Sequence, residues 1–272
     1  MPRLNRSPAE AIRGMHFGAV LALLFVSAAS LLAAGCASGS AKPARSVALA
    51  NAPVGAIRGT TEEGVSVYRG IPYALAPKGE RRWAPPVAVP DWEGERDARA
   101  FGPSCPQPEP RMASIYATEL GPVDEDCLSL NVWAPEDARD APVFVWIHGG
   151  SLTTGAGSQP MYDGAGMARD QGLVVVTINY RLGVLGYLAH PGLSAESGQG
   201  VSGNYGLMDQ VLALKWVERN IAAFGGNPDN VTIAGESAGA LSVVLLMTSP
   251  KAQGLFDKAI AQSAYMVTMA AL

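Results

Sequence analysis

Charge and histidine are both scarce in this sequence. Charged residues make up 16% of its 272 positions, and only three histidines occur. The net charge is −4, but Arg3, Arg6 and Arg13 against one acid, Glu10, contribute +2 at the start, so the chain without residues 1–36 carries −6. Binding to nucleic acid requires a basic face, which a mildly acidic body lacks. We therefore expect no nucleic-acid partner.

A long uncharged run follows the N-terminal arginines. Residues 17–34 carry no charge and are rich in Ala, Leu and Val, and small residues then lead directly into Cys36. This end resembles the lipobox of bacterial lipoproteins. We expect residues 1–36 to be a signal peptide, with Cys36 lipidated and the protein exported to the bacterial cell envelope. The alternatives are plain secretion and a transmembrane anchor, for which the run is only marginally long enough. Residues 37–53 are small and polar, as in a flexible tether.

Cysteine is scarce as well, and export would set its redox state. Of the three cysteines, Cys36 belongs to the signal, which leaves Cys105 and Cys127. In an oxidising compartment such a pair is expected to form a disulfide. The segment between them is rich in proline and has little that could pack, so a bridge would restrict the unfolded chain there. The alternative is two buried free thiols.

Short apolar runs alternate with helical patterns along the rest of the chain. This alternation predicts an α/β fold with a mostly parallel sheet whose central strands are covered on both faces. A hairpin is predicted over residues 55–68. Strands are predicted at 128–133, with one buried face, and at 143–147, 173–178, 231–234 and 259–262, which are buried; helices are predicted at 205–224 and 238–247.

The run Gly235-Glu236-Ser237-Ala238-Gly239 stands between a predicted strand and a predicted helix. A serine on so sharp a turn takes strained backbone, and glycines two positions to either side avoid clashes. The turn lifts the hydroxyl clear of the sheet at a helix N-terminus, where free N–H groups favour a developing anion. Strand, turn and helix together form a nucleophile elbow, which makes Ser237 the predicted nucleophile.

A glycine-rich loop follows another predicted buried strand. His148-Gly149-Gly150-Ser151 leaves the strand at 143–147 and continues into Thr153-Thr154-Gly155-Ala156-Gly157. At the carboxyl end of a neighbouring strand, this loop can aim backbone N–H groups at Ser237 and form an oxyanion hole with the N–H of Ala238. The alternative is a phosphate-binding loop, which is disfavoured because neither Gly-Lys-Ser/Thr nor a complete dinucleotide fingerprint is present.

At these residues the sequence resembles the type-B carboxylesterases, which include the cholinesterases. The match extends roughly from Val54 to the end of the chain, and its motifs occur in family order. They are Gly70-Ile-Pro-Tyr-Ala74 with Arg82-Trp83, Glu125-Asp-Cys-Leu-Ser-Leu-Asn-Val-Trp133, His148-Gly-Gly150, Asn179-Tyr-Arg-Leu-Gly183, Gly203-Asn-Tyr-Gly-Leu-Met-Asp-Gln210, Phe224-Gly-Gly-Asn-Pro228 and Gly235-Glu-Ser-Ala-Gly239.

The resemblance implies an α/β-hydrolase fold over residues 54–272 and hydrolysis of small-molecule carboxylic esters without metal or cofactor. It also implies specific roles: Ser237 as nucleophile, backbone oxyanion donors at Gly150, Ser151 and Ala238, and a disulfide between Cys105 and Cys127. Ser151 departs from the family, which usually has Gly or Ala there. A serine backbone N–H serves equally well, but its side chain can narrow the acyl side of the pocket.

No histidine follows Ser237, and the one acid after it, Asp257, is expected at the surface. Attack of the Ser237 hydroxyl on an ester carbonyl needs a base. In this fold the base is a histidine held by an acid, and both lie later in the chain than the serine. His16 lies in the signal, His190 precedes a proline in a loop, and the resemblance makes His148 structural. We therefore expect the triad acid and histidine, and the last strands of the sheet, to be absent from this chain. A fragment of a longer reading frame, a truncated product or a frameshifted relic would each explain this.

Two functions from different classes remain open on this sequence. The first is a cell-envelope carboxylesterase whose 272-residue chain has little or no turnover by itself. The second is a non-catalytic, cholinesterase-like module for binding or adhesion. The intact elbow and Gly-Gly loop favour the esterase, since a pure binding module need not retain them.

Overall fold

The structure is a computed structural model, and it describes residues 46–109 and 120–264. The predicted signal peptide with Cys36, and residues 37–45 of the predicted tether, lie outside the described residues. The strands are β1 (Ser46–Ala52), β2 (Gly55–Glu62), β3 (Val65–Pro72), β4 (Glu95–Asp97), β5 (Ser129–Pro135), β6 (Ala141–Ile147), β7 (Val174–Ile178), β8 (Gly226–Glu236) and β9 (Lys258–Gln262). The helices are α1 (Ala165–Gln171), α2 (Gly183–Tyr187), α3 (Pro191–Glu196), α4 (Tyr205–Asn220) and α5 (Ala238–Thr248), with 3-10 turns η1 (Gly79–Arg81), η2 (Pro160–Tyr162), η3 (Ile221–Phe224) and η4 (Pro250–Ala252).

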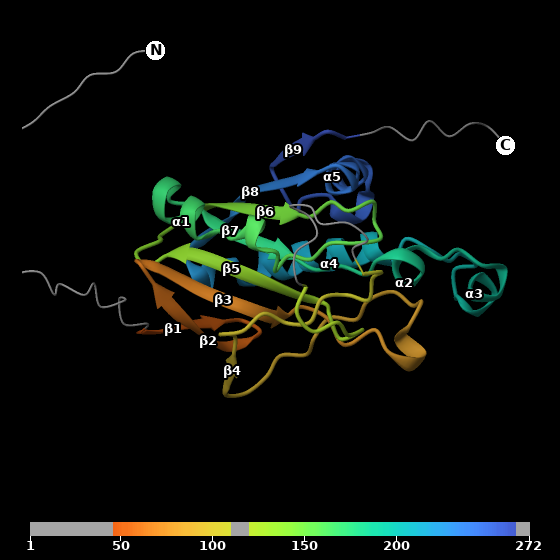
Figure 1. The fold of residues 1–272 in the computed structure, drawn as a ribbon, viewed down its shortest axis with the longest axis horizontal. Helices are drawn as coiled ribbons and strands as arrows, with labels where there is room; N and C mark the ends of the chain where they lie inside the picture. The colour runs from red at the N-terminus through yellow and green to blue at the C-terminus, as the bar shows by residue number, and fades with distance from the viewer. Residues whose placement is uncertain (1–45, 110–119, 265–272) are drawn as a thin grey trace, which may run out of the picture. The chain divides into compact units, whose positions relative to one another are not determined.

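All of these strands belong to one mixed sheet (Figure 1). Their order is β1-β2-β3-β5-β7-β6-β8-β9, with β4 pairing beside β2. Strands β7, β6, β8 and β9 run parallel, which is where the sequence predicted a parallel sheet. From β1 through β2, β3 and β5 to β7 the pairing is antiparallel, and the predicted hairpin at 55–68 is formed by β2 and β3.

The two faces of the sheet pack against different helices. On β6, Val143, Val145 and Ile147 are buried in the larger core beneath α4 and α5, while Phe144 and Trp146 point to the opposite face and are half-buried. That opposite face is partly covered by α1, whose Ala168 packs with strand residues in a smaller core. The apolar stripe predicted on the helix at 205–224 is confirmed, because its residues join the larger core or pack against it. Within the described residues, no helix is both long and apolar enough to cross a bilayer.

Two expectations about the ends of the domain are wrong. Residues 46–52, assigned to the tether, form β1, which pairs along its whole length with β2, so the folded domain begins before residue 54. The strand predicted at 259–262 exists as β9, but most of its residues are exposed. The reason is that β9 is the last strand in the sheet order, and within the described residues its only strand neighbour is β8.

Candidate active site

The predicted elbow is present at the end of β8. This strand ends at Glu236, α5 begins at Ala238, and Ser237 between them has φ 54° and ψ −117°. A non-glycine residue with this backbone is strained, and such strain is characteristic of functional sites. The first N–H groups of α5 have no intrahelical acceptor, so they are available to an anion beside Ser237.

The glycines on either side of Ser237 are required by close backbone contacts. A Cβ placed on Gly235 would lie 2.5 Å from the carbonyl carbon of Gly239. A Cβ placed on Gly239 would lie 2.1 Å from the carbonyl oxygen of Ile147, at the end of β6. No side chain fits at either distance, so the Gly-x-Ser-x-Gly spacing is imposed by the packing of the turn against itself and against the neighbouring strand.

The glycine loop after β6 lies against the elbow, as the sequence predicted. Strands β6 and β8 are parallel with Ile147 opposite Gly235, so both end at the same edge of the sheet. A Cβ on Gly149 would be 2.8 Å from the carbonyl oxygen of Glu236 and 3.4 Å from the Cβ of Ser237. The loop therefore approaches Ser237 so closely that Gly149 has no room for a side chain.

The loop backbone at Gly150 and Ser151 takes positive φ values of 102° and 56°. The carbonyl oxygen of Gly150 accepts hydrogen bonds from the backbone N–H groups of Thr153 and Thr154, both at 3.0 Å. In the described part of the chain, the N–H groups of Gly150 and Ser151 have no acceptor. Both residues line a cavity of about 270 Å³ together with Ser237; its full lining is Gly149, Gly150, Ser151, Thr154, Gly155, Gln159, Tyr162, Glu236 and Ser237. Ala238 is fully buried at the start of α5.

His148 is buried beneath the loop. Its Nδ1 is 2.8 Å from the carbonyl oxygen of Gly149, and its ring stacks on Tyr180 with centroids 4.4 Å apart. The Tyr180 hydroxyl donates to the His148 carbonyl oxygen at 2.7 Å. Burial lowers the pKa of His148 to about 4, against a weaker opposing effect of its hydrogen bond to Gly149. A histidine so enclosed is a packing residue, as the family resemblance implied.

The other histidine, His190, and the acid that follows Ser237, Asp257, make their hydrogen bonds with other parts of the chain. His190 is exposed and caps α3, where its Nδ1 accepts a hydrogen bond from the backbone N–H of Gly192 at 3.1 Å. Asp257 is exposed just before β9, as expected, and its Oδ2 accepts from the backbone N–H of Val231 at 2.8 Å. Neither histidine of the described residues shares a hydrogen bond with the Ser237 hydroxyl.

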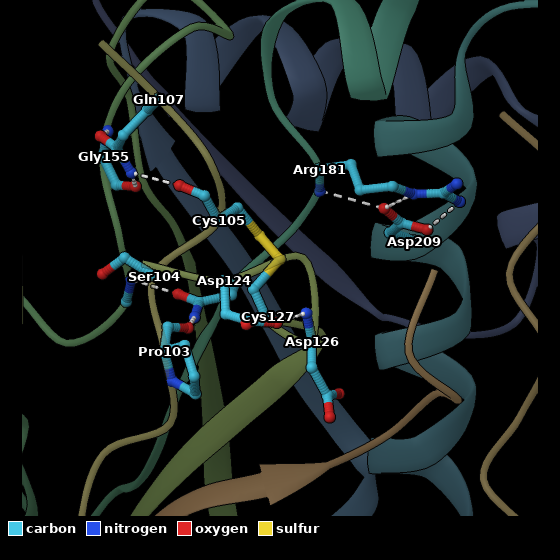
Figure 2. Close-up of a disulfide and its surroundings, with 12 residues drawn as sticks. Pro103, Ser104, Cys105, Gln107, Asp124, Asp126, Cys127, Gly155, Arg181 and Asp209 are labelled. Atoms are coloured by element: carbon cyan, nitrogen blue, oxygen red, sulfur yellow. Dashed lines mark hydrogen bonds and ion pairs between the residues drawn. A yellow bond between two sulfur atoms is a disulfide. The ribbon is translucent and has the colours of Figure 1, made fainter. Parts of the chain in front are cut away.

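The predicted disulfide between Cys105 and Cys127 is present, and both residues are buried (Figure 2). The alternative of two free thiols is therefore wrong.

Within the described ranges, no group of three or more His, Cys, Asp or Glu residues could hold a metal ion.

The far end of the glycine loop is held by polar side chains to which the sequence assigned no role in the site. The N–H of Gly157 donates to Asn179 Oδ1 at 2.8 Å, and its carbonyl oxygen accepts from Thr177 Oγ1 at 2.8 Å and more weakly from Asn131 at 3.4 Å. All three side chains are buried. For Thr177 in β7 and Asn131 in β5, a polar residue inside a buried strand is the signal that could have identified them, whereas Asn179 directly follows β7.

The elbow, the facing glycine loop and the mixed sheet together define an α/β hydrolase. The chain matches the model of the carboxylesterase family over residues 45–272, and it belongs to that family. It is 50% identical over 216 residues to the para-nitrobenzyl esterase of Bacillus subtilis (strain 168), an alignment that covers 79% of this chain and 43% of that protein. It is 48% identical over 211 residues to the fumonisin B1 esterase of Sphingopyxis macrogoltabida, covering 77% and 38%.

Solved structures agree with this assignment. A thermophilic PNB esterase superposes with a TM-score of 0.74 at 47% identity, over 79% of this chain and 44% of that one. A carboxylesterase of Geobacillus stearothermophilus superposes with a TM-score of 0.71 at 48% identity, over 78% and 42%. The resemblance to type-B carboxylesterases is thus confirmed. The chain spans less than half the length of these relatives.

Proposed function

We propose that this chain carries the nucleophile half of a carboxylic ester hydrolase, with Ser237 as the attacking residue. The observation that carries the proposal is the strained backbone of Ser237 close beside Gly149, in a cavity that Gly150 and Ser151 also line. Membership of the carboxylesterase family and the esterase names of its relatives support the same reaction.

In this mechanism, the Ser237 oxygen attacks the ester carbonyl carbon while its proton passes to a base. The N–H groups of Gly150, Ser151 and Ala238 hold the oxyanion that forms, because they are fixed in place before charge develops. The C–O bond to the alcohol then breaks, and the alcohol leaves with the proton from the base. Water attacks the acyl-enzyme in the same way and releases the acid and the free serine.

The base is the part that the described residues do not supply. His148 is enclosed by Gly149 and Tyr180, and His190 caps α3. We therefore propose that the triad histidine and its acid are absent from residues 1–272, and that this chain alone turns over esters slowly or not at all. Robust hydrolysis of a short-chain p-nitrophenyl ester by the purified 272-residue chain, abolished by Ser237→Ala, would contradict this and point to His148 or His190.

Covalent labelling tests the nucleophile itself. A fluorophosphonate probe applied to the full-length gene product should modify Ser237, and the label should be lost in Ser237→Ala. Ser249→Ala is the matched control, since Ser249 lies at the opposite end of α5 and should leave labelling unchanged. An enzyme preparation that never labels at Ser237 would instead identify a non-catalytic binding module.

We also propose that the protein is exported and lipid-anchored through Cys36. The proposal rests on the arginines, the uncharged run and the small residues before this cysteine. Cells that express the gene with a radioactive fatty acid should give a labelled envelope protein, and Cys36→Ser should remove the label. A labelled Cys36→Ser protein, or an unlabelled parent protein found in the medium, would rule out the anchor.

A further inference from the structure

Gln107 lies between the disulfide and the glycine loop, and the proposed mechanism assigns it no role. It stands two positions after Cys105 and is flanked by Pro106 and Pro108, which restrict the backbone on both sides. Its side chain is half-buried and points toward Gly155 (Figure 2).

The side-chain amide of Gln107 makes three hydrogen bonds. Its Nε2 donates to the carbonyl oxygen of Gly155 at 2.9 Å and to that of Cys105 at 3.0 Å. Its Oε1 accepts from the backbone N–H of Gly155 at 2.8 Å. Both backbone polar groups of Gly155 are therefore bound by one side chain, as a neighbouring strand would bind them. The same amide is tied to the backbone of the disulfide residue.

Gly155 in turn supports the part of the loop that meets the nucleophile. It has φ 109°, and a Cβ there would lie 2.4 Å from His148 Nδ1 and 2.8 Å from the carbonyl oxygen of Gly149. A Cβ on Gly149 would in turn lie 3.4 Å from the Cβ of Ser237. A displacement of Gly155 can thus reach Ser237 through the backbone of Gly149.

The other end of this connection is anchored in the sheet. Cys127 is buried, bonded to Cys105, and stands two residues before β5 begins at Ser129. The disulfide therefore fixes the segment that carries Gln107 to a central strand. We propose that Gln107 is a positioning residue, which transmits the restraint of the Cys105–Cys127 disulfide to the oxyanion loop through Gly155. Its consequence for catalysis rests on the proposed function, whereas its consequence for loop order does not.

Amide hydrogen exchange of the 272-residue chain tests the structural part without any need for turnover. In Gln107→Ala, peptides that cover residues 149–157 should exchange about tenfold faster than in the parent chain, the effect of losing hydrogen bonds of ordinary net strength. Gln107→Glu retains the acceptor for the Gly155 N–H but loses the donor, and should give an intermediate rate. Ser104→Ala is the matched control. It removes a hydrogen bond to Leu120 at 2.7 Å on the same segment, without touching the loop. Equal exchange at 149–157 in Gln107→Ala and Ser104→Ala would overturn the proposal.

A double-mutant cycle tests the coupling to the disulfide. Cys105→Ser with Cys127→Ser should also speed exchange at residues 149–157, and adding Gln107→Ala should then have little further effect. Strictly additive changes would overturn the coupling. In the full-length gene product, Gln107→Ala should lower kcat about tenfold with KM within twofold. It should weaken the binding of a boronic acid that mimics the tetrahedral intermediate to a similar degree. If the parent enzyme is active and Gln107→Ala leaves its kcat unchanged, the catalytic role of Gln107 is refuted. A parent that is never labelled at Ser237 would refute the proposed function, while the exchange result would still stand or fall by itself.

Discussion

The side chains of Arg181 and Asp209 form a buried, bidentate ion pair. Arg181 Nε lies 2.8 Å from Asp209 Oδ2, and a terminal guanidinium nitrogen lies 2.7 Å from Oδ1. The Arg181 backbone N–H also donates to Oδ2 at 3.0 Å (Figure 2). The two side chains are 3% and 0% exposed. This pair joins the chain just after β7 to α4, and it links the Asn179–Gly183 and Gly203–Gln210 motifs.

Removing one partner of this pair should destabilise the fold strongly, since it leaves an uncompensated buried charge. We expect Asp209→Ala to lower the free energy of unfolding by about 3–5 kcal/mol. Urea denaturation of the 272-residue chain would measure this. Asp91→Ala is the control, because Asp91 pairs with Arg219 in a half-exposed ion pair, and it should cost under about 1 kcal/mol. An equal decrease in the free energy of unfolding in the two variants would contradict a larger contribution from the buried pair.

The buried His148 should make the fold less stable in acid. Burial lowers its pKa from 6.5 to about 4, so as the pH falls the unfolded chain takes up the proton first. The stabilisation is complete above pH 6.5 and is lost as the pH falls from 6.5 toward 4. From this residue alone, we expect the free energy of unfolding to fall by roughly 2 kcal/mol between about pH 8 and 5. His148→Phe retains a ring to stack on Tyr180 and should flatten the profile. An unchanged slope in that variant would contradict the assignment.

Two Gly→Ala substitutions, one at the elbow and one in α1, should have opposite effects on stability. Gly239→Ala would place a methyl group 2.1 Å from the Ile147 carbonyl oxygen and should lower the free energy of unfolding by about 3 kcal/mol. It should also abolish the labelling of Ser237 by a fluorophosphonate. Gly166→Ala lies within α1 with nothing within 4 Å of the new Cβ. It should be neutral or stabilise the fold by up to about 1 kcal/mol, because alanine is the better helix former. Thermal denaturation of both variants, with fluorophosphonate labelling, would separate the two effects.

The disulfide should contribute substantially to stability. Cys105 and Cys127 are 22 residues apart, and closing a loop of this size in the unfolded chain corresponds to about 3 kcal/mol in the chain-entropy model. We expect a replacement of both cysteines by serine to lower the free energy of unfolding by that amount. Denaturation of the oxidised parent with and without a reducing agent provides a second measurement. A parent chain that is insensitive to reduction would contradict the prediction.

Much of the site could be predicted from the sequence because its requirements are local. Glycines at 235 and 239 and the buried runs at 143–147 and 231–234 are short-range patterns, and the parallel register of β6 and β8 places their ends together. By contrast, β1 was missed. Its buried positions are Ala48, Ala50 and Ala52, and alanine is a poor strand former whose small side chain gives little alternation signal.

Contacts between distant residues were beyond sequence reasoning. Gln107 and Gly155 are 48 residues apart, and nothing in a Pro-Gln-Pro segment indicates which backbone its amide will bind. The same holds for Asp209, whose charge would ordinarily place it on an exposed helix face. Only the position of Arg181 explains its burial. Sequence patterns thus located the candidate nucleophile and the glycine loop, whereas the side chains that hold them in place required the structure.

The backbone N–H of Ser237 donates to the carbonyl oxygen of Gln262 at 2.9 Å, across the pairing of β8 with β9. A hydrogen bond of the Ser237 backbone is thus completed by a strand whose residue is made 25 positions later. During synthesis the strained turn cannot take this final form when its own residues emerge, but only after β9 has added to the sheet. The order of chain growth therefore delays the final geometry of the turn at the predicted nucleophile until β9 has been made.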